Sequence, residues 1–126
     1  MNSQIGIAQK PERHPKGWGY EDWIVNSEKY CGKMLFFKQG KRCSAHYHKR
    51  KDETFYLESG ALEVALADSP EAWHSGKRIK ILLCPGDTLY IWPRRIHQMI
   101  ALKDSRLFEF STQHFEEDSY RLERGD

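Results

Sequence analysis

The stretch GKRCSAHYHKRKDETFYLESG, residues 40–60, decides the fold and contains most of the chemistry. Its two histidines, His46 and His48, lie on one face of a strand, because side chains of a strand alternate between its faces. Glu53 follows five residues after His48, and whether the strand continues or bulges there, its side chain can still point inward. His97, further along the chain, is a fourth candidate metal ligand. Imidazoles plus a carboxylate form a mixed nitrogen and oxygen site for a divalent transition metal. The residue types do not choose among Zn, Mn, Fe, Ni and Co.

Short strand-like runs recur on both sides of this stretch, separated by turn residues. The expected strands are residues 20–26, 31–38, 42–48, 54–58, 61–67, 78–84, 88–92, 97–102 and 106–111. Residues 68–76 are polar and predict a loop, and residues 116–126 predict a short helical turn or an extended tail. Many short strands with almost no helix indicate an all-β antiparallel sandwich or barrel of the jelly-roll kind.

Length and composition limit the classes of function. A chain of 126 residues suits one domain, which we place at 17–126 after an N-terminal arm at 1–16 that is flexible or docks late as a strand. A net charge of +2 gives no strong field for nucleic acid or a membrane, so we expect neither as a partner. No apolar run has the length of a membrane span. Three cysteines without a C-x-x-C pair predict reduced thiols in the cytoplasm.

Residues 40–60 match every fixed position of G-x5-H-x-H-x(3,4)-E-x6-G, the first motif of the cupin superfamily, and the chain resembles that superfamily. The second motif, G-x5-P-x-G-x2-H-x3-N, is matched at Gly86 and His97. Its other fixed positions are occupied by Trp92, Arg94 and Ala101. The resemblance implies a double-stranded β-helix jelly roll, the cupin barrel, with one divalent metal in the barrel mouth held by the three histidines and the glutamate.

Three further segments narrow the resemblance. Residues 17–21 (GWGYE), 29–33 (YCG between two lysines) and 109–121 are similar to the C-terminal cupin domain of type II mannose-6-phosphate isomerases and to small stand-alone cupins of sugar metabolism. The nucleotidyltransferase domain of those enzymes is missing, and residues 122–125 replace their Y-G-R ending. The resemblance implies aldose–ketose isomerisation of a sugar or sugar phosphate through a metal-stabilised ene-diolate.

Basic and aromatic residues near the metal motifs are candidates for substrate binding. Arg94 and Arg95 precede His97, and Arg42 lies on the approach to the first motif. A guanidinium grips an oxyanion at two points, although ordinary solvated charge is the alternative for each arginine. Trp92 leads into the loop that carries His97, so we expect it near the sugar.

Isomerisation also needs a group that moves a proton between adjacent carbons. Glu109 lies between two phenylalanines, and a carboxylate in an apolar cavity can have its pKa raised into a useful range. The alternative is that the phenylalanines face the core and Glu109 faces solvent. Weaker candidates are Lys38, Tyr47, His114 and Arg121, and for His114 we expect a surface position.

Two other functions stay open, and the assembly is an expectation. A non-catalytic cupin that binds a sugar or small acid, as a sensor or accessory subunit, fits the altered second motif. A metal-dependent dioxygenase fits the same ligand types, but fold does not imply function. We expect a homodimer formed through a sheet edge or an exchanged N-terminal segment.

Overall fold

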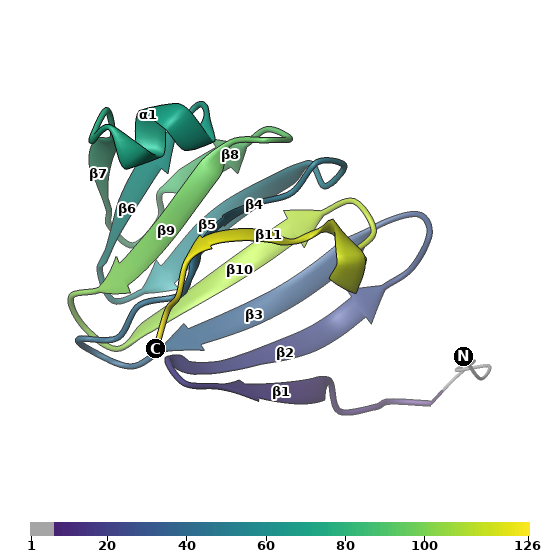
Figure 1. The fold of residues 1–126 in the computed structure, drawn as a ribbon. Helices are drawn as coiled ribbons and strands as arrows, with labels where there is room; N and C mark the ends of the chain where they lie inside the picture. Colours follow the sequence, from purple (N-terminus) through teal and green to yellow (C-terminus); the bar gives the residue numbers. More distant parts are fainter. Residues whose placement is uncertain (1–6) are drawn as a thin grey trace.

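Two antiparallel sheets face each other in the computed structural model, which describes residues 7–126 (Figure 1). In spatial order, the six-stranded sheet contains β1 (Glu12–Lys16), β2 (Gly19–Asn26), β3 (Cys31–Phe37), β10 (Ser105–Ser111), β5 (Glu53–Ser59) and β8 (Thr88–Ile91). The five-stranded sheet contains β11 (Tyr120–Glu123), β4 (Ala45–Tyr47), β9 (Ile96–Ala101), β6 (Leu62–Ala67) and β7 (Ile79–Leu83). Neighbours such as β3 and β10 lie far apart in sequence, which is the jelly-roll topology that the sequence predicted.

The core lies between the inner faces of the two sheets. Phe37, Leu57 and Leu107 of the larger sheet are fully buried, as are Leu62 and Val64 of the smaller one. Burial of apolar side chains contributes about 1.5–3 kcal/mol for each large residue, so these inner faces hold the sheets together. Several core residues, among them Phe37, Phe55 and Met99, also line the polar cavity between the sheets.

The predicted strands all overlap observed ones, and the main differences lie at the two ends of the chain. The strand expected at 42–48 is confined to Ala45–Tyr47. The second half of the N-terminal arm forms β1, which pairs with β2 over its whole length. Residues 1–6 of that arm lie outside the described residues. At the other end, a 3-10 turn (Glu116–Asp118) leads into β11, so both forms expected for this segment occur.

The loop expected at 68–76 is wrong, because it contains the helix α1 (Pro70–His74). Ser69 caps this helix by accepting a hydrogen bond from the Ala72 N–H at 3.0 Å, and Pro70 occupies the first turn. Ser followed by Pro is a helix-start signal that the polar composition concealed. Trp73 anchors the helix, fully buried against the smaller sheet. No helix within residues 7–126 is long and apolar enough to cross a membrane.

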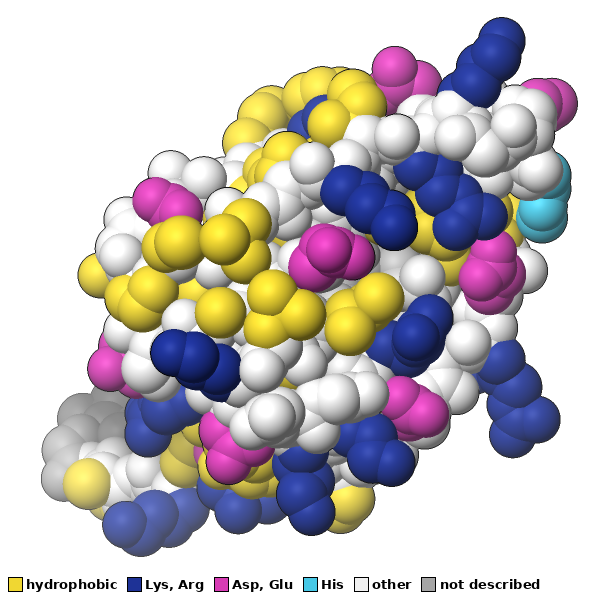
Figure 2. Space-filling model, turned by 90° about the vertical axis from the view of Figure 1, so that its left-hand side faces the viewer, with side chains coloured by type: hydrophobic (Ala, Val, Ile, Leu, Met, Phe, Trp, Pro, Cys, Tyr) yellow, Lys and Arg dark blue, Asp and Glu magenta, His cyan; other side chains and the backbone are white. Residues whose placement is uncertain are grey.

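The outer surface carries exposed apolar side chains as well as charges. Hydrophobic side chains gather in a band on the face that lies at the left in Figure 1, with lysines and arginines around it (Figure 2). Ile79 and Leu82 are exposed on β7, which is an edge strand of the five-stranded sheet. An open edge of this kind is where a second chain would pair, and the expected homodimer stays a prediction.

Candidate metal centre

Three histidines converge inside the barrel mouth. His46 lies on β4 and is the register partner of His97 on β9, while His48 follows directly after β4. One nitrogen of each imidazole lies within 4.8 Å of the corresponding nitrogens of the other two. The H-x-H spacing puts two of them on one face of the chain, and antiparallel pairing brings the third alongside. The structure therefore positions the three predicted histidines to hold one metal ion.

Hydrogen bonds to the backbone fix which nitrogen of each ring is free. Every Nδ1 lies opposite a carbonyl oxygen, which can only accept, so each Nδ1 carries the proton and each Nε2 keeps a lone pair. The pairs are His46 with Ser44 at 2.9 Å, His48 with Asp118 at 2.7 Å and His97 with Arg95 at 3.0 Å. Such outer contacts orient the imidazoles of metal sites before the ion binds.

The electrostatic setting keeps these imidazoles neutral. Burial, and next the neighbouring imidazole in the cluster, lowers the pKa of His46, His48 and His97 to about 3. All three rings are therefore unprotonated at Nε2 near pH 7. A neutral imidazole is the form that coordinates a metal, so no proton has to leave on binding.

Glu53 supplies an oxygen beside the histidines. Its Oε2 lies 3.7 Å from Nε2 of His48 and 3.5 Å from Nε2 of His97. Burial and the nearby charge of Glu109 raise the pKa of Glu53 well above its ordinary value. Within the described residues its buried Oε2 has no hydrogen-bond partner. Buried polar atoms are nearly always partnered, and a cation would satisfy this one. Three imidazoles and one carboxylate fit a divalent transition metal.

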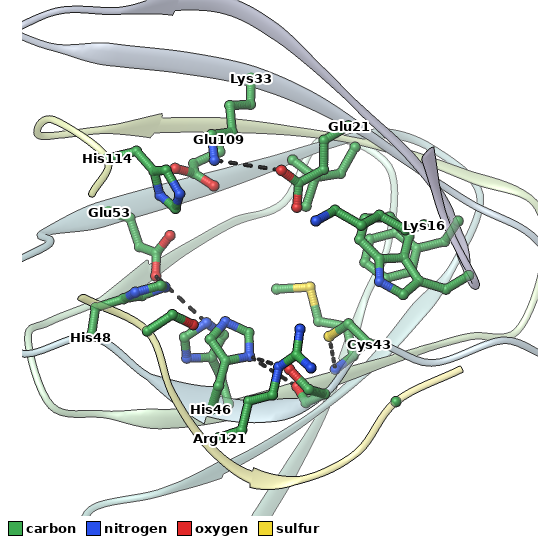
Figure 3. Close-up of a pocket in the computed structure, with 18 of the residues that line it drawn as sticks. Lys16, Glu21, Lys33, Cys43, His46, His48, Glu53, Glu109, His114 and Arg121 are labelled. Atoms are coloured by element: carbon green, nitrogen blue, oxygen red, sulfur yellow. Dashed lines mark hydrogen bonds and ion pairs between the residues drawn. The ribbon is translucent and has the colours of Figure 1, made fainter. Parts of the chain in front are cut away.

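The histidines form one wall of a cavity of about 750 Å³ between the two sheets (Figure 3). Trp18 and Trp23 contribute flat apolar surface to the lining. The basic side chains in the lining are Lys16, Lys33, Lys51, Arg121 and Arg124, and the acidic ones are Glu21, Glu53, Glu109, Glu116 and Asp126. Five formal positive charges cancel five negative ones, so a bound divalent cation would leave a surplus of two positive charges.

Glu109 points into this cavity, which excludes the solvent-facing alternative. The phenylalanine that follows it is the exposed residue, with 56% of Phe110 accessible. Glu109 accepts hydrogen bonds from Lys51 Nζ at 2.9 Å and from Ser111 Oγ at 2.8 Å. Burial alone would raise its pKa, but Lys51 and Lys33 lower the pKa of Glu109 to about 2. It is a paired carboxylate, and the expectation of a raised pKa is wrong.

The four residues expected to bind substrate lie outside the cavity lining. Arg94 is exposed on a turn, where its backbone has φ 74° and its N–H donates to the His48 carbonyl at 2.6 Å. Arg95 stacks on Trp92 at 3.8 Å and donates to the Tyr90 carbonyl. Arg42 is exposed as well. The backbone of the loop before His97 thus bonds to the backbone of His48, while the side chains of Arg94 and Arg95 lie outside the cavity lining.

Sequence reasoning missed the lysines that do line the cavity. Lys33 is 2% accessible and lies beside Glu109 and Trp23 in the strand register. Lys51 belongs to the run 49–51, which looks like a solvated corner, yet it is 3% accessible. One signal could have pointed to these lysines: if Glu109 is buried, a neighbouring strand has to supply a cation. The sequence alone does not show which distant strand that is.

No protein-family model and no curated protein sequence matches the chain. Solved structures do match its fold. Oxalate decarboxylase from Bacillus subtilis at pH 4.6 has a TM-score of 0.76 and 20% identity, covering 89% of this chain and 30% of that one. CapF with the inhibitor 3-isopropenyl-tropolone has a TM-score of 0.78 and 16% sequence identity, and the match covers 96% of this chain and 37% of CapF. KdgF from Halomonas sp. has a TM-score of 0.65 and 22% sequence identity, and the match covers 78% of this chain and 81% of KdgF.

These likenesses define the class of fold. The protein is a cupin-type jelly roll whose three inward histidines are placed to bind a metal. It spans about a third of the length of the first two structures, 30% and 37%. At these identities the likeness shows the fold alone, so the activity has to be argued from the cavity.

Proposed function

We propose that the protein is a metal-dependent enzyme that interconverts aldose and ketose forms of a small sugar phosphate. One observation carries the proposal. Three neutral imidazoles and the unpartnered oxygen of Glu53 converge on one wall of a polar cavity of about 750 Å³. Cavities of roughly 300–1,000 Å³ hold small-molecule substrates. The residues that would hold the cation are His46, His48, His97 and Glu53.

The charges of the cavity suit an anionic substrate. Without a metal, the formal charges of the lining cancel, and the raised pKa of Glu53 moves the balance towards positive charge. A divalent cation adds two positive charges, which a phosphate monoester of about −2 neutralises. Among the exposed charged residues of the lining, the basic ones (Lys16, Arg121 and Arg124) outnumber the acidic ones (Glu116 and Asp126), which favours entry of an oxyanion. Binding of the anion is therefore coupled to binding of the metal.

The deeper wall opposite the histidines suits sugar hydroxyls. Glu21 and Lys33 form an ion pair at 3.5 Å, and Glu109 and Lys51 form one at 2.9 Å. Carboxylate oxygens accept from hydroxyl groups and ammonium groups donate to them. Lys33 also lies 4.3 Å from the ring centre of Trp23, on which His14 stacks with ring centres 4.0 Å apart. Trp23 therefore helps to hold the ammonium group of Lys33 in place.

The chemistry divides between the cation and these side chains. A divalent cation held by the three histidines and Glu53 would supply positive charge that stabilises the negative charge formed on the substrate. The side chains hold the sugar in one orientation and exclude bulk water. Isomerisation then moves one proton between adjacent carbons, and the electron pair of the broken C–H bond forms the double bond of an ene-diol. The paired state of Glu109 favours the alternative that the cavity only binds its ligand.

Measurements of turnover and of ligand binding distinguish an isomerase from a non-catalytic binding protein. Protein loaded with Mn, Zn, Fe, Ni or Co is incubated with mannose 6-phosphate or fructose 6-phosphate and followed by NMR. We expect slow equilibration of the two phosphates, which stops when the metal is chelated. Calorimetric binding of either phosphate without any interconversion would contradict the isomerase proposal and support the non-catalytic cupin.

A further inference from the structure

His114 carries an unexplained polar atom in the cavity wall. Its imidazole points into the cavity near Glu53 and Glu109 (Figure 3). Only 11% of the side chain is accessible, and within residues 7–126 its Nδ1 is buried without a hydrogen-bond partner. A buried ring nitrogen that no protein group satisfies is available to a ligand. The expected surface position of His114 is therefore wrong.

The backbone of His114 is fixed by a side chain from a distant strand. Asn26 Nδ2 donates to the His114 carbonyl at 3.1 Å, and the His114 N–H donates to Asn26 Oδ1 at 2.8 Å. The edge of the imidazole lies against Trp23, with ring centres 5.1 Å apart. Two hydrogen bonds and one aromatic contact hold the ring at the cavity wall, as a group that meets substrate requires.

Other proton-carrying groups in this wall are engaged. Glu109 is tied to Lys51 at 2.9 Å, and its charge raises the pKa of Lys51, which stays an ammonium group despite its burial. Glu21 accepts from Trp23 Nε1 at 2.9 Å and pairs with Lys33. The contacts of both carboxylates are with cations or N–H and O–H donors, through Oε2 of Glu109 and Oε1 of Glu21. A carboxylate held beside a positive charge is a weaker base than a free one. Nδ1 of His114, in contrast, is buried and has no hydrogen-bond partner within residues 7–126.

The far side of the imidazole leads to solvent. Nε2 of His114 lies 3.7 Å from Oε1 of Glu116, whose side chain is 80% accessible. A proton gained at Nδ1 makes an imidazolium ion, and a carboxylate at this position stabilises that charge. Because Glu116 meets water, a proton on His114 can exchange with solvent. His114 thus joins the interior of the cavity to the exterior.

We propose that His114 is the catalytic residue that takes up and returns the substrate proton. This proposal rests on the isomerase function proposed above and gives the proton transfer a residue. The C–H bond next to the carbonyl breaks and an N–H bond forms at Nδ1, while the electron pair forms the carbon–carbon double bond and moves the carbonyl electrons onto oxygen. The hydroxyl proton passes to the adjacent oxygen that took up the carbonyl electrons. The N–H then breaks as its proton joins the adjacent carbon, the second oxygen becomes the new carbonyl, and His114 returns to its starting state.

The test uses His114→Ala, with exposed His74→Ala on α1 as the control. Metal-loaded proteins are incubated with fructose 6-phosphate in heavy water, and turnover and deuterium uptake are read by NMR. A positioned general base contributes roughly 100- to 10,000-fold. We expect His114→Ala to lose at least about 100-fold in kcat with its metal content unchanged, and added imidazole to restore part of that activity. His74→Ala keeps wild-type turnover.

Two outcomes overturn the proposal in different ways. Wild-type turnover in His114→Ala, without imidazole, removes His114 from the proton transfer while the isomerase function stands. A wild-type protein that loads metal but neither isomerises nor exchanges protons contradicts the isomerase function itself. His114→Gln, which keeps a polar side chain of similar length but cannot carry the proton, separates loss of folding from loss of chemistry when both variants melt at the same temperature.

Exposed Glu116 provides an independent check. Glu116→Gln removes the carboxylate 3.7 Å from Nε2 and one negative charge from the cavity lining, but it keeps the size of the side chain. We expect this variant to incorporate less deuterium for each turnover, because the proton on His114 exchanges more slowly with solvent. Unchanged deuterium uptake alongside unchanged turnover would contradict the path through Glu116.

Discussion

His48 Nδ1 donates a hydrogen bond of 2.7 Å to the backbone carbonyl of Asp118, although the two residues lie 70 positions apart in the chain. The Asp118 carboxylate accepts from the backbone N–H groups of residues 49, 50 and 51 at 2.9, 3.2 and 3.1 Å. Asp118, which lies in the 3-10 turn before β11, therefore orients the imidazole of His48 and fixes the turn at residues 49–51. The C-terminal segment thus helps to shape the metal site.

Replacing Asp118 by Ala tests this link. The variant removes the carboxylate that accepts hydrogen bonds from the N–H groups of residues 49–51. Each buried N–H group left without a partner costs about 1–3 kcal/mol. We expect a loss of about 2–3 kcal/mol in the free energy of unfolding and a 10- to 100-fold loss of metal affinity, roughly the effect of outer-contact changes in metal sites. Urea unfolding and metal titration measure the two. Glu117→Ala is the control, because Glu117 is exposed, and it should change neither beyond about 0.5 kcal/mol. Equal effects of both variants would contradict the role of Asp118.

The buried pair of Glu109 and Lys51 makes a second prediction. Glu109→Gln leaves a buried ammonium group without its partner, which costs about 3–5 kcal/mol. Glu109→Gln/Lys51→Met removes both charges, so we expect it to be more stable than Glu109→Gln alone. Urea unfolding of wild type, both single variants and the double variant measures the coupling. Strict additivity would show that the two side chains do not interact.

The same pair predicts a pH dependence. The pKa of Glu109 is about 2 in the folded protein, below its ordinary 4.5. The unfolded chain therefore binds this proton first, and the stabilisation by Glu109 is present above pH 4.5 and is lost as the pH falls towards 2. We expect the unfolding free energy of the wild type to fall more steeply below pH 4.5 than that of Glu109→Gln/Lys51→Met. Parallel pH curves would contradict the lowered pKa.

The local part of the fold and site could be predicted from the sequence. Strand periodicity gave the strands, and the H-x-H spacing with Glu53 and His97 gave the side chains that meet in the barrel mouth. The rest depends on which distant strands pair. Pairing of β10 with β3 turns Glu109 inward beside Lys33, and the turn after β8 directs Arg94 outward. Register and turn geometry of this kind leave no trace in residue order.

The two glycines that bracket the metal motif have different roles, which gives a fourth prediction. Both have positive φ, 83° at Gly40 and 96° at Gly60. A Cβ at Gly40 would have no atom within 4 Å, whereas one at Gly60 would collide with Ser105 and the Asp104 carbonyl. We expect Gly40→Ala to cost about 1 kcal/mol from backbone strain and Gly60→Ala clearly more. Thermal unfolding compares them, and equal losses would contradict the close approach at Gly60.

Metal should also stabilise the fold, because the site is absent from the unfolded chain. At a free metal concentration 100 times the dissociation constant, the expected gain is about 2.7 kcal/mol. His97→Ala should lose this gain, and its apo melting temperature should fall only by what the lost contact with Phe55 costs, with ring centres 6.2 Å apart. Thermal melts of both proteins with and without Zn or Mn check this. An equal metal response in His97→Ala would show that the ion binds elsewhere.

The most direct test of the central claim is the metal content of the protein, measured by elemental analysis after purification without chelator or affinity tag. A His46→Ala/His48→Ala variant is measured beside it. We predict about one divalent transition metal for each wild-type chain and none in the variant. Wild-type protein that holds no metal, and takes up none on reconstitution, would contradict the assignment of this cavity as a metal centre.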